Sequence, residues 1–247
     1  MALHRKFPAL LALEPDIAII GECARPEIVR AKMAAAAPEC REVWIGTNPN
    51  KGLGVFAFGD YQLRLIDAYD ASLHYIAPVE VTGPHPFNLL AVWAQNANEN
   101  QRKKDIPGPL RDALDLYQGF LTDRPAVVTG DTNNNVIWDK PGWPMNWATT
   151  VEVLEGLGLI SAYHHLSGEA QGDETTPTLY WRDRVKDGPT YHIDYTFVPE
   201  VWLDHIANFA VGTYEDWCGN GLSDHVPLIV DIDGDSVGED QPVRRRK

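Results

Sequence analysis

The chain has 247 residues, 44% of them hydrophobic and 23% charged, a composition typical of a globular protein large enough to bury a sizeable core. Its 35 acidic and 21 basic residues give a net charge of −14, which argues against a protein that coats nucleic acid through non-specific phosphate contacts. No apolar run approaches the roughly 20 residues needed to span a bilayer, so we expect no membrane contact. The three cysteines form neither a CxxC pair nor a disulfide framework, which favours a cytoplasmic protein.

Helical spacing of apolar side chains marks four segments. The first contains Phe7, Leu10 and Leu11 and has no small-residue cleavage site, so we interpret it as an amphipathic helix and not as a signal peptide. Pro26 stands at the start of the second, where proline is favoured. The predicted helices cover residues 4–13, 26–37, 106–122 and 148–157.

Short apolar runs bounded by turn residues predict the strands. They cover residues 16–21, 42–46, 54–58, 62–68, 75–81, 88–93, 126–129, 176–181, 191–199, 204–211 and 226–232, with a further extended segment at 160–164. Strands outnumber helices, and the two kinds of element do not strictly alternate. This pattern favours an α+β fold in which two sheets pack together with helices outside, over a doubly wound parallel sheet.

The C-terminal segment DGDSVGEDQPVRRRK is polar and carries no periodicity. We therefore expect a mobile polar tail at residues 233–247, after one domain that covers residues 1–232. No sequence feature indicates an oligomer interface, and a monomer is the default expectation.

Polar clusters follow or precede four of the predicted strands. They contain Glu22, then Asp131 with Asn133, then His192 with Asp194, and finally Asp224 with His225. Taken singly, an acid at a strand end often caps a turn. Together, carboxylates from separate strands can converge on one edge of a sheet, where oxygen ligands suit Mg²⁺ and an acid beside a histidine fixes the imidazole tautomer. A metal, an amide donor and a histidine are what phosphate-ester hydrolysis requires.

Four motifs occur in an order that points to one family. They are LEPDIAIIGE at 13–22, GDTN at 130–133, HIDYTFVP at 192–199 and LSDHVPL at 222–228. This series resembles the endonuclease/exonuclease/phosphatase superfamily, which has the deoxyribonuclease-like fold. The resemblance covers about residues 3–232 and implies a four-layer α/β/β/α sandwich of two packed mixed sheets.

The resemblance also implies a metal site. Glu22 would hold a divalent cation, and Asp224 would support the metal site or its hydrogen-bond network. Mg²⁺ is the expected metal, with Mn²⁺ as a possible substitute, since both take oxygen ligands.

The same resemblance implies catalytic roles for four residues. Asp131 and Asn133 would lie at the attacking water and the phosphate. His225 would contact the phosphate, and Asp194 would hydrogen-bond His225. The sequence leaves open whether Asp131 or His225 takes the proton from water.

The chain departs from the family at its start. Family members usually begin with a strand ending in a Trp-Asn motif, whereas here the first predicted helix follows Met1 almost at once. Either the start was assigned too far downstream or the domain works without this strand. Its absence would leave apolar surface and an open sheet edge.

Three possible substrate-binding residues also depart from, or extend, the family pattern. Trp93 stands where relatives deliver a Tyr or His to the phosphate, and an indole donates one hydrogen bond but has no acid–base function. Packing in the core is an equally good interpretation of Trp93. Asn96 stands at a position of polar substrate contact, and His192 replaces a common Arg.

We therefore predict a Mg²⁺-dependent phosphoesterase that hydrolyses phosphodiester bonds, with DNA or RNA as the favoured substrate. The alternative is a phosphatase acting on a small phosphorylated molecule or a lipid head group. A second alternative is a non-catalytic binding protein on the same scaffold, because fold alone does not fix function.

Overall fold

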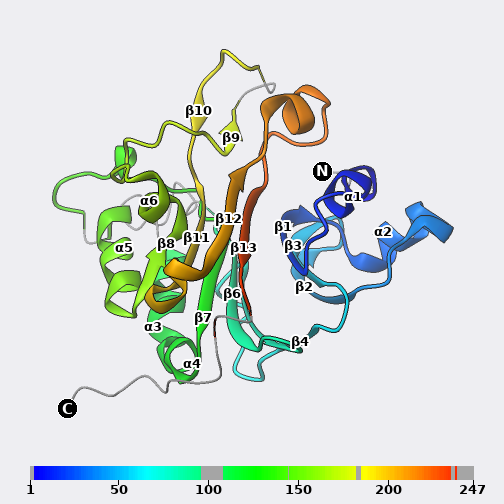
Figure 1. Ribbon diagram of the computed structural model, residues 1–247, viewed down its shortest axis with the longest axis horizontal. Helices are drawn as coiled ribbons and strands as arrows, with labels where there is room; N and C mark the ends of the chain where they lie inside the picture. Colours follow the sequence, from blue (N-terminus) through cyan, green and yellow to red (C-terminus); the bar gives the residue numbers. More distant parts are fainter. Residues whose placement is uncertain (1–2, 96–107, 144, 182–184, 235–236, 238–247) are drawn as a thin grey trace.

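The computed structural model describes residues 3–95, 108–143, 145–181, 185–234 and 237 (Figure 1). Its larger sheet has six strands in the order β4-β5-β6-β7-β11-β8. Neighbouring strands are antiparallel except β6 and β7, which run parallel. The strands are β4 (Gln62–Leu65), β5 (Ile76–Thr82), β6 (Phe87–Trp93), β7 (Ala126–Asp131), β11 (Asp194–Pro199) and β8 (Leu159–Ser161).

A second layer of strands covers one face of this sheet. It consists of a three-stranded sheet, β1-β3-β2, and a separate antiparallel pair, β12 with β13. The strands are β1 (Ile17–Cys23), β2 (Arg41–Asn48), β3 (Lys51–Ala57), β12 (Ile206–Val211) and β13 (Leu228–Ile232). Val55, Val79 and Leu89 belong to the buried cluster between the two layers, which excludes water from both.

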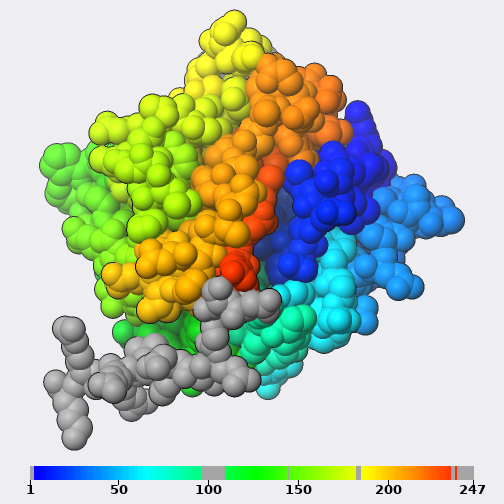
Figure 2. Space-filling model, viewed as in Figure 1, coloured from blue at the N-terminus to red at the C-terminus, as the bar shows by residue number. Residues whose placement is uncertain are grey.

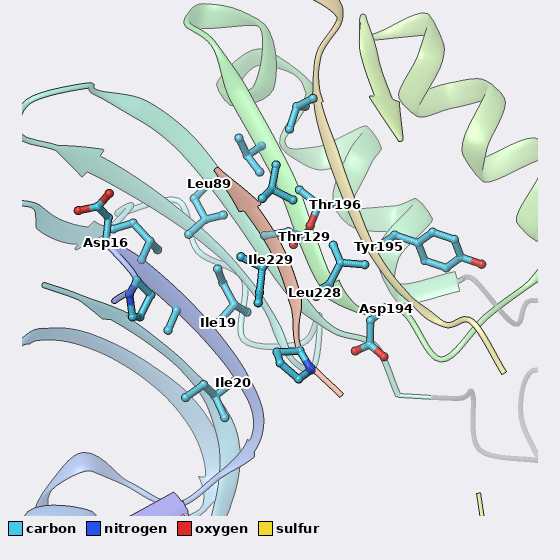
Figure 3. Close-up of a pocket in the computed structure, with 18 of the residues that line it drawn as sticks. Asp16, Ile19, Ile20, Leu89, Thr129, Asp194, Tyr195, Thr196, Leu228 and Ile229 are labelled. Atoms are coloured by element: carbon cyan, nitrogen blue, oxygen red, sulfur yellow. Dashed lines mark hydrogen bonds between the residues drawn. The ribbon is translucent and has the colours of Figure 1, made fainter. Parts of the chain in front are cut away.

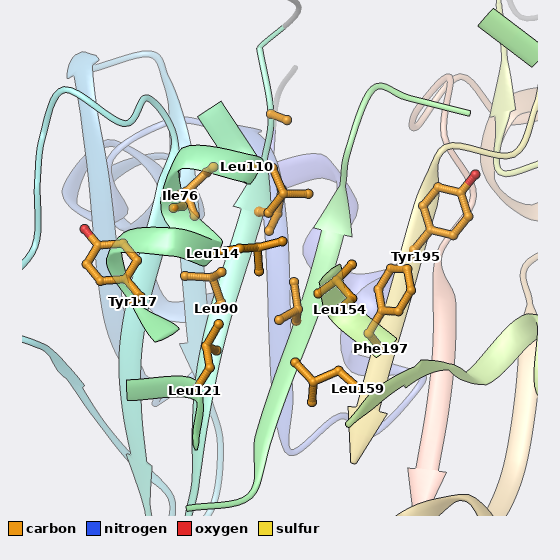
Figure 4. Close-up of a cluster of buried hydrophobic side chains, with 14 of the residues drawn as sticks. Ile76, Leu90, Leu110, Leu114, Tyr117, Leu121, Leu154, Leu159, Tyr195 and Phe197 are labelled. Atoms are coloured by element: carbon orange, nitrogen blue, oxygen red, sulfur yellow. The ribbon is translucent and has the colours of Figure 1, made fainter. Parts of the chain in front are cut away.

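Helices cover the outer faces, which completes four layers and confirms the predicted α+β sandwich. On the three-stranded sheet lie α1 (Leu3–Leu11) and α2 (Pro26–Met33), with Phe7 of α1 packed edge-on against Phe56. On the six-stranded sheet lie α3 (Gly108–Leu116), α4 (Gln118–Asp123) and α5 (Trp147–Gly156), which bury the apolar cluster drawn in Figure 4. None of the helices in the described ranges has the length and apolarity needed to cross a membrane.

Local sequence fixes where α5 begins. Asn146 and Thr149 form a capping box, and the Asp139 carboxylate accepts hydrogen bonds from the backbone N–H groups of Trp147 and Ala148. Trp147 is fully buried and lies against Tyr195 of β11. The cap therefore sets the register of α5 against the strand that begins with Asp194.

A groove separates the two pieces of the second layer. Among the described residues β1 pairs only with β3, and β13 pairs only with β12, so each strand has one unpaired edge. Between these edges lies a cavity of about 1830 Å³, which we call the inter-strand groove. Ile19 and Ile229 line its two sides and Leu89 its floor (Figure 3). The blue surface near the N-terminus and the red surface of β13 border it in Figure 2.

Several predicted boundaries are wrong. The predicted helix at 106–122 is two helices, α3 and α4, with a break at Tyr117, whose φ of −99° and ψ of 15° leave the helical range. The extended segment predicted at 160–164 ends at Ser161, because Ser161 Oγ contacts His164 Nδ1 at 2.8 Å and a short helix, α6 (Ala162–Ser167), begins.

Other strands are shorter than predicted. The strand predicted at 176–181 contains only β9 (Leu179–Tyr180), which pairs with β10 (Thr190–Tyr191). A 3₁₀ segment, η3 (Glu200–His205), occupies the start of the strand predicted at 204–211. Further short helical segments are η1 (Ala34–Ala36), η2 (Val136–Trp138) and the π-helical η4 (Glu215–Gly219). Most of the tail predicted at 233–247 lies outside the described residues.

Candidate active site

Strand register brings two acids and one histidine together at one end of the inter-strand groove. Asp131 ends β7 and lies opposite Asp194, the first residue of β11. His225 precedes β13 and is bridged to Leu179. One ligand atom from each of the three polar residues lies within 4.8 Å of the other two. All three line the groove, and Asp194 is drawn there in Figure 3.

The imidazole of His225 is oriented by Asp194. Its Nδ1 lies 2.8 Å from Asp194 Oδ2, and because a carboxylate only accepts hydrogen bonds, Nδ1–H is the donor. Nε2 lies 3.9 Å from Asp131 Oδ2. Burial would lower the pKa of His225, but attraction to Asp194, the hydrogen bond with it and attraction to Asp131 together raise this pKa above the ordinary value. This shift favours the imidazolium form of the ring.

The surroundings of Asp131 disfavour its charged form, whereas those of His225 favour the charged imidazolium. Burial and repulsion from Asp194 raise the pKa of Asp131, while His225 and the backbone N–H of Asn133 act against the shift. A carboxylate with a raised pKa accepts a proton more readily than an ordinary one.

The GDTN turn shapes this environment. Gly130 has a φ of 136°, and a Cβ there would lie 1.9 Å from the carbonyl oxygen of Val92, so only glycine fits before Asp131. Asn133 has a φ of 50° and donates its backbone N–H to Asp131 Oδ1 at 2.8 Å. Its side-chain Nδ2 donates to Asp131 Oδ2 at 3.0 Å and to the Ala94 carbonyl at 2.8 Å. Asn133 thus holds Asp131 in place, and its amide donors are engaged within the protein.

The two acids of the implied metal site lie on opposite borders of the groove. Glu22 is on β1, and its Oε1 lies 2.9 Å from Lys51 Nζ. Asp224 directly precedes His225, and its Oδ1 is buried with no hydrogen-bond partner among the described residues. A buried carboxylate oxygen without a partner is costly unless a cation or a proton compensates it. The unpartnered oxygen of Asp224 therefore fits a ligand of a divalent cation.

Trp93 lies beside this site and is also part of the core. It is only 3% exposed and stacks on Tyr75 with ring centroids 4.7 Å apart, while Lys51 Nζ lies 5.3 Å from its ring centroid. It lines the groove as well. Trp93 therefore forms part of the wall of the groove and also packs in the core.

The structure does not bring His192, another predicted substrate contact, to the groove. His192 is buried, donates from Nδ1 to the Thr176 carbonyl at 2.7 Å and is not among the residues that line the groove. Asn96 lies outside the described residues.

A buried polar network behind the site was not predicted. Asn135 Nδ2 lies 3.0 Å from Glu174 Oε2, 3.0 Å from the His192 carbonyl and 3.1 Å from Tyr195 Oη. His164 Nε2 lies 3.1 Å from Glu174 Oε1. The network ties the turn after GDTN to the strand that begins with Asp194. Its only signal in the sequence is the asparagine run that follows Thr132.

Glu174→Gln is expected to lower the free energy of unfolding by on the order of 2–3 kcal/mol at pH 7. Burial alone would raise the pKa of Glu174, but hydrogen bonds from His164, Asn135 and the backbone of Gly172 lower it to about 2. Because the pKa is lower in the folded than in the unfolded state, this stabilisation is complete above about pH 4.5 and is lost as the pH falls toward 2. Urea unfolding at a series of pH values measures it.

The matched control is Glu152→Gln, on the exposed face of α5, which should change the free energy of unfolding by less than about 0.5 kcal/mol. If the free energy of unfolding of Glu174→Gln fell between pH 4.5 and 2 as much as that of the wild type, Glu174 would not be the stabilising carboxylate of this network.

Comparison with known proteins gives matches in structure alone. No protein-family model matches the sequence, and no curated protein sequence does either. The chain is similar to the endonuclease domain of TRAS1, a telomere-specific non-LTR retrotransposon, with 17% identity, coverage of 94% of this chain and 92% of that one, and a TM-score of 0.60.

Two further solved structures show the same likeness. An AP endonuclease from Archaeoglobus fulgidus has 16% identity, coverage of 94% of both chains and a TM-score of 0.64. The 3′ phosphatase NExo from Neisseria, bound to a product DNA hairpin, has 15% identity, coverage of 94% and 96%, and a TM-score of 0.62. The likeness extends over nearly the whole chain, and it shows that this protein has the same deoxyribonuclease-like fold as these structures.

Proposed function

We propose that the protein is a divalent-metal-dependent phosphodiesterase that hydrolyses DNA or RNA. The observation that carries this proposal is the meeting of Asp131, Asp194 and His225 within 4.8 Å, with the imidazolium of His225 directed into the groove. The similar structures described above include nucleases and a phosphatase with a DNA product, which supports the same class of chemistry.

Each side chain has a distinct task in the proposed reaction. The Nε2–H of His225 donates to a phosphate oxygen and stabilises the charge that develops there. Asp131, held by Asn133, accepts the proton of the attacking water. Asp194 keeps His225 charged and in the correct tautomer. A divalent cation held by Glu22 and Asp224 would supply positive charge to the phosphate.

Net charge favours one alternative substrate class. At −14, the chain lacks the excess of basic residues that a long polyanion prefers, and this supports a small phosphomonoester as the second candidate.

A cytoplasmic monomer with its domain over residues 1–232 remains part of the proposal.

Hydrolysis of a substrate panel tests the proposed function. The panel contains plasmid, single-stranded DNA, abasic duplex, RNA, inositol phosphates and a simple diester, each with Mg²⁺, with Mn²⁺ and with excess chelator. We expect turnover of at least one nucleic acid with metal and none with chelator. Turnover of only the inositol phosphates would favour the phosphatase. No turnover by the folded protein would favour a scaffold that only binds.

A further inference from the structure

Lys6 extends from α1 toward the acids of the implied metal site. Its side chain is half-buried and lines the inter-strand groove together with Glu22 and Asp224. No sequence motif singles it out. It is the one lysine that lines this groove within the described ranges.

Ser223 anchors the ammonium group of Lys6. Lys6 Nζ donates to Ser223 Oγ at 3.1 Å, and the same oxygen accepts the backbone N–H of His225 at 3.1 Å. Ser223 is only 5% exposed, so this anchor is part of the packed turn that carries Asp224 and His225. The lysine is therefore held at the turn and does not extend into bulk water.

Electrostatics show which groups the ammonium compensates. Burial lowers the pKa of Lys6, while attraction to Asp224 and then to Glu22 acts to keep the group charged. Lys51 differs, because its side chain is 48% exposed and its ion pair is with Glu22. Among the described residues, Lys6 is thus the lysine that lines the groove together with both acids.

We propose that Lys6 is a built-in counter-ion of Glu22 and Asp224 that competes with the divalent cation for this acid pair. The inference rests on the metal site of the proposed function. An ammonium near a carboxylate stabilises its negative charge when no metal is bound, and it repels an incoming dication. The coupling is reciprocal, so the charge at Lys6 lowers the metal affinity and a bound metal disfavours that charge.

Direct titration of Mn²⁺ without substrate tests the inference, with isothermal calorimetry as the readout and Mg²⁺ as a second probe. Lys6→Met is expected to lower the dissociation constant for Mn²⁺ by roughly tenfold or more, since one nearby positive charge is removed. Lys6→Arg keeps the charge and should bind as the wild type does. Lys32→Met removes an exposed charge from the end of α2 and serves as the matched control.

Circular dichroism and the urea midpoint establish that each variant is folded. Lys6→Gln removes the charge but retains an amide donor for Ser223, so it serves if Lys6→Met does not fold. Unchanged or weaker Mn²⁺ binding in the neutral variants, or no binding to any variant, would overturn the inference. Turnover on the substrate panel is measured separately. Tighter Mn²⁺ binding by the neutral Lys6 variants, with no turnover of any substrate by the wild type, would contradict the proposed function and leave the inference standing. Metal-dependent turnover by the wild type, with the same Mn²⁺ affinity in the wild type and the neutral Lys6 variants, would contradict the inference and leave the proposed function standing.

Discussion

His225→Ala is expected to lower the turnover of the best substrate by about 10²- to 10³-fold, the usual contribution of a donor that stabilises charge developing in the transition state. The variant loses the Nε2–H that is directed into the groove and leaves Asp194 without its 2.8 Å partner. Since the ring stabilises charge that develops during the reaction, kcat should fall more than KM rises. Steady-state kinetics on the substrate selected by the panel measures the effect.

The control for this experiment is His165→Ala, which removes an exposed imidazole at the end of α6. It should retain wild-type turnover. Asp194→Asn is the informative second variant, because it keeps a hydrogen-bonding group at His225 but removes the charge that holds the ring protonated. If His225→Ala retained more than about a tenth of wild-type turnover, well outside the range for a donor that stabilises the transition state, the proposed mechanism would be abandoned.

Trp147→Ala is expected to reduce the free energy of unfolding by about 3–5 kcal/mol, the cost of removing a large aromatic side chain from a packed core. Trp147 has 0% exposure, and its ring lies 4.9 Å from Tyr195 and 6.3 Å from Phe197 between centroids. Its Nε1–H also donates to Gln171 Oε1 at 3.1 Å. The midpoint and slope of denaturant unfolding give the change.

Trp181→Ala provides the comparison, because Trp181 is 45% exposed and the same truncation there should cost less than about 1 kcal/mol. Equal losses at the two positions would show that Trp147 does not anchor α5 to β11.

Much of the proposed site was predictable because its residues lie in short motifs at strand ends. GDTN, HIDYTFVP and LSDHVPL supplied Asp131, Asp194 and His225, and pairing of β7 with β11 brings the two acids into register. His192 shows the limit of this reasoning. It lies two residues before Asp194 in the same motif, yet its ring packs on Tyr163 with centroids 4.3 Å apart.

The remaining site residues carried no motif. Lys6 approaches the acids only because α1 packs on the three-stranded sheet, and its anchor, Ser223, is 217 residues away in the chain. Glu174 accepts a hydrogen bond from Asn135, which lies 39 residues earlier in the chain. Such contacts depend on tertiary packing, which single-sequence patterns do not encode.

The fold was predictable where apolar runs are long. The runs in β5, β6 and β7 are buried on both faces and predicted these strands within two residues at each end. Short segments failed, as in α6, whose six residues contain no full apolar stripe and whose start depends on a contact from Ser161 to His164.

With the proposed metal site, the inter-strand groove would link metal binding to the stability of the fold. Glu22 belongs to β1 and Asp224 precedes β13, so a ligand that binds both carboxylates acts as a clamp between two strands that share no ladder hydrogen bonds. Such a ligand raises the free energy of unfolding by an amount that grows with its concentration. By the same linkage, a molecule that separates the two strands would weaken binding to both carboxylates, so the width of the groove and the occupancy of the two acids would be coupled.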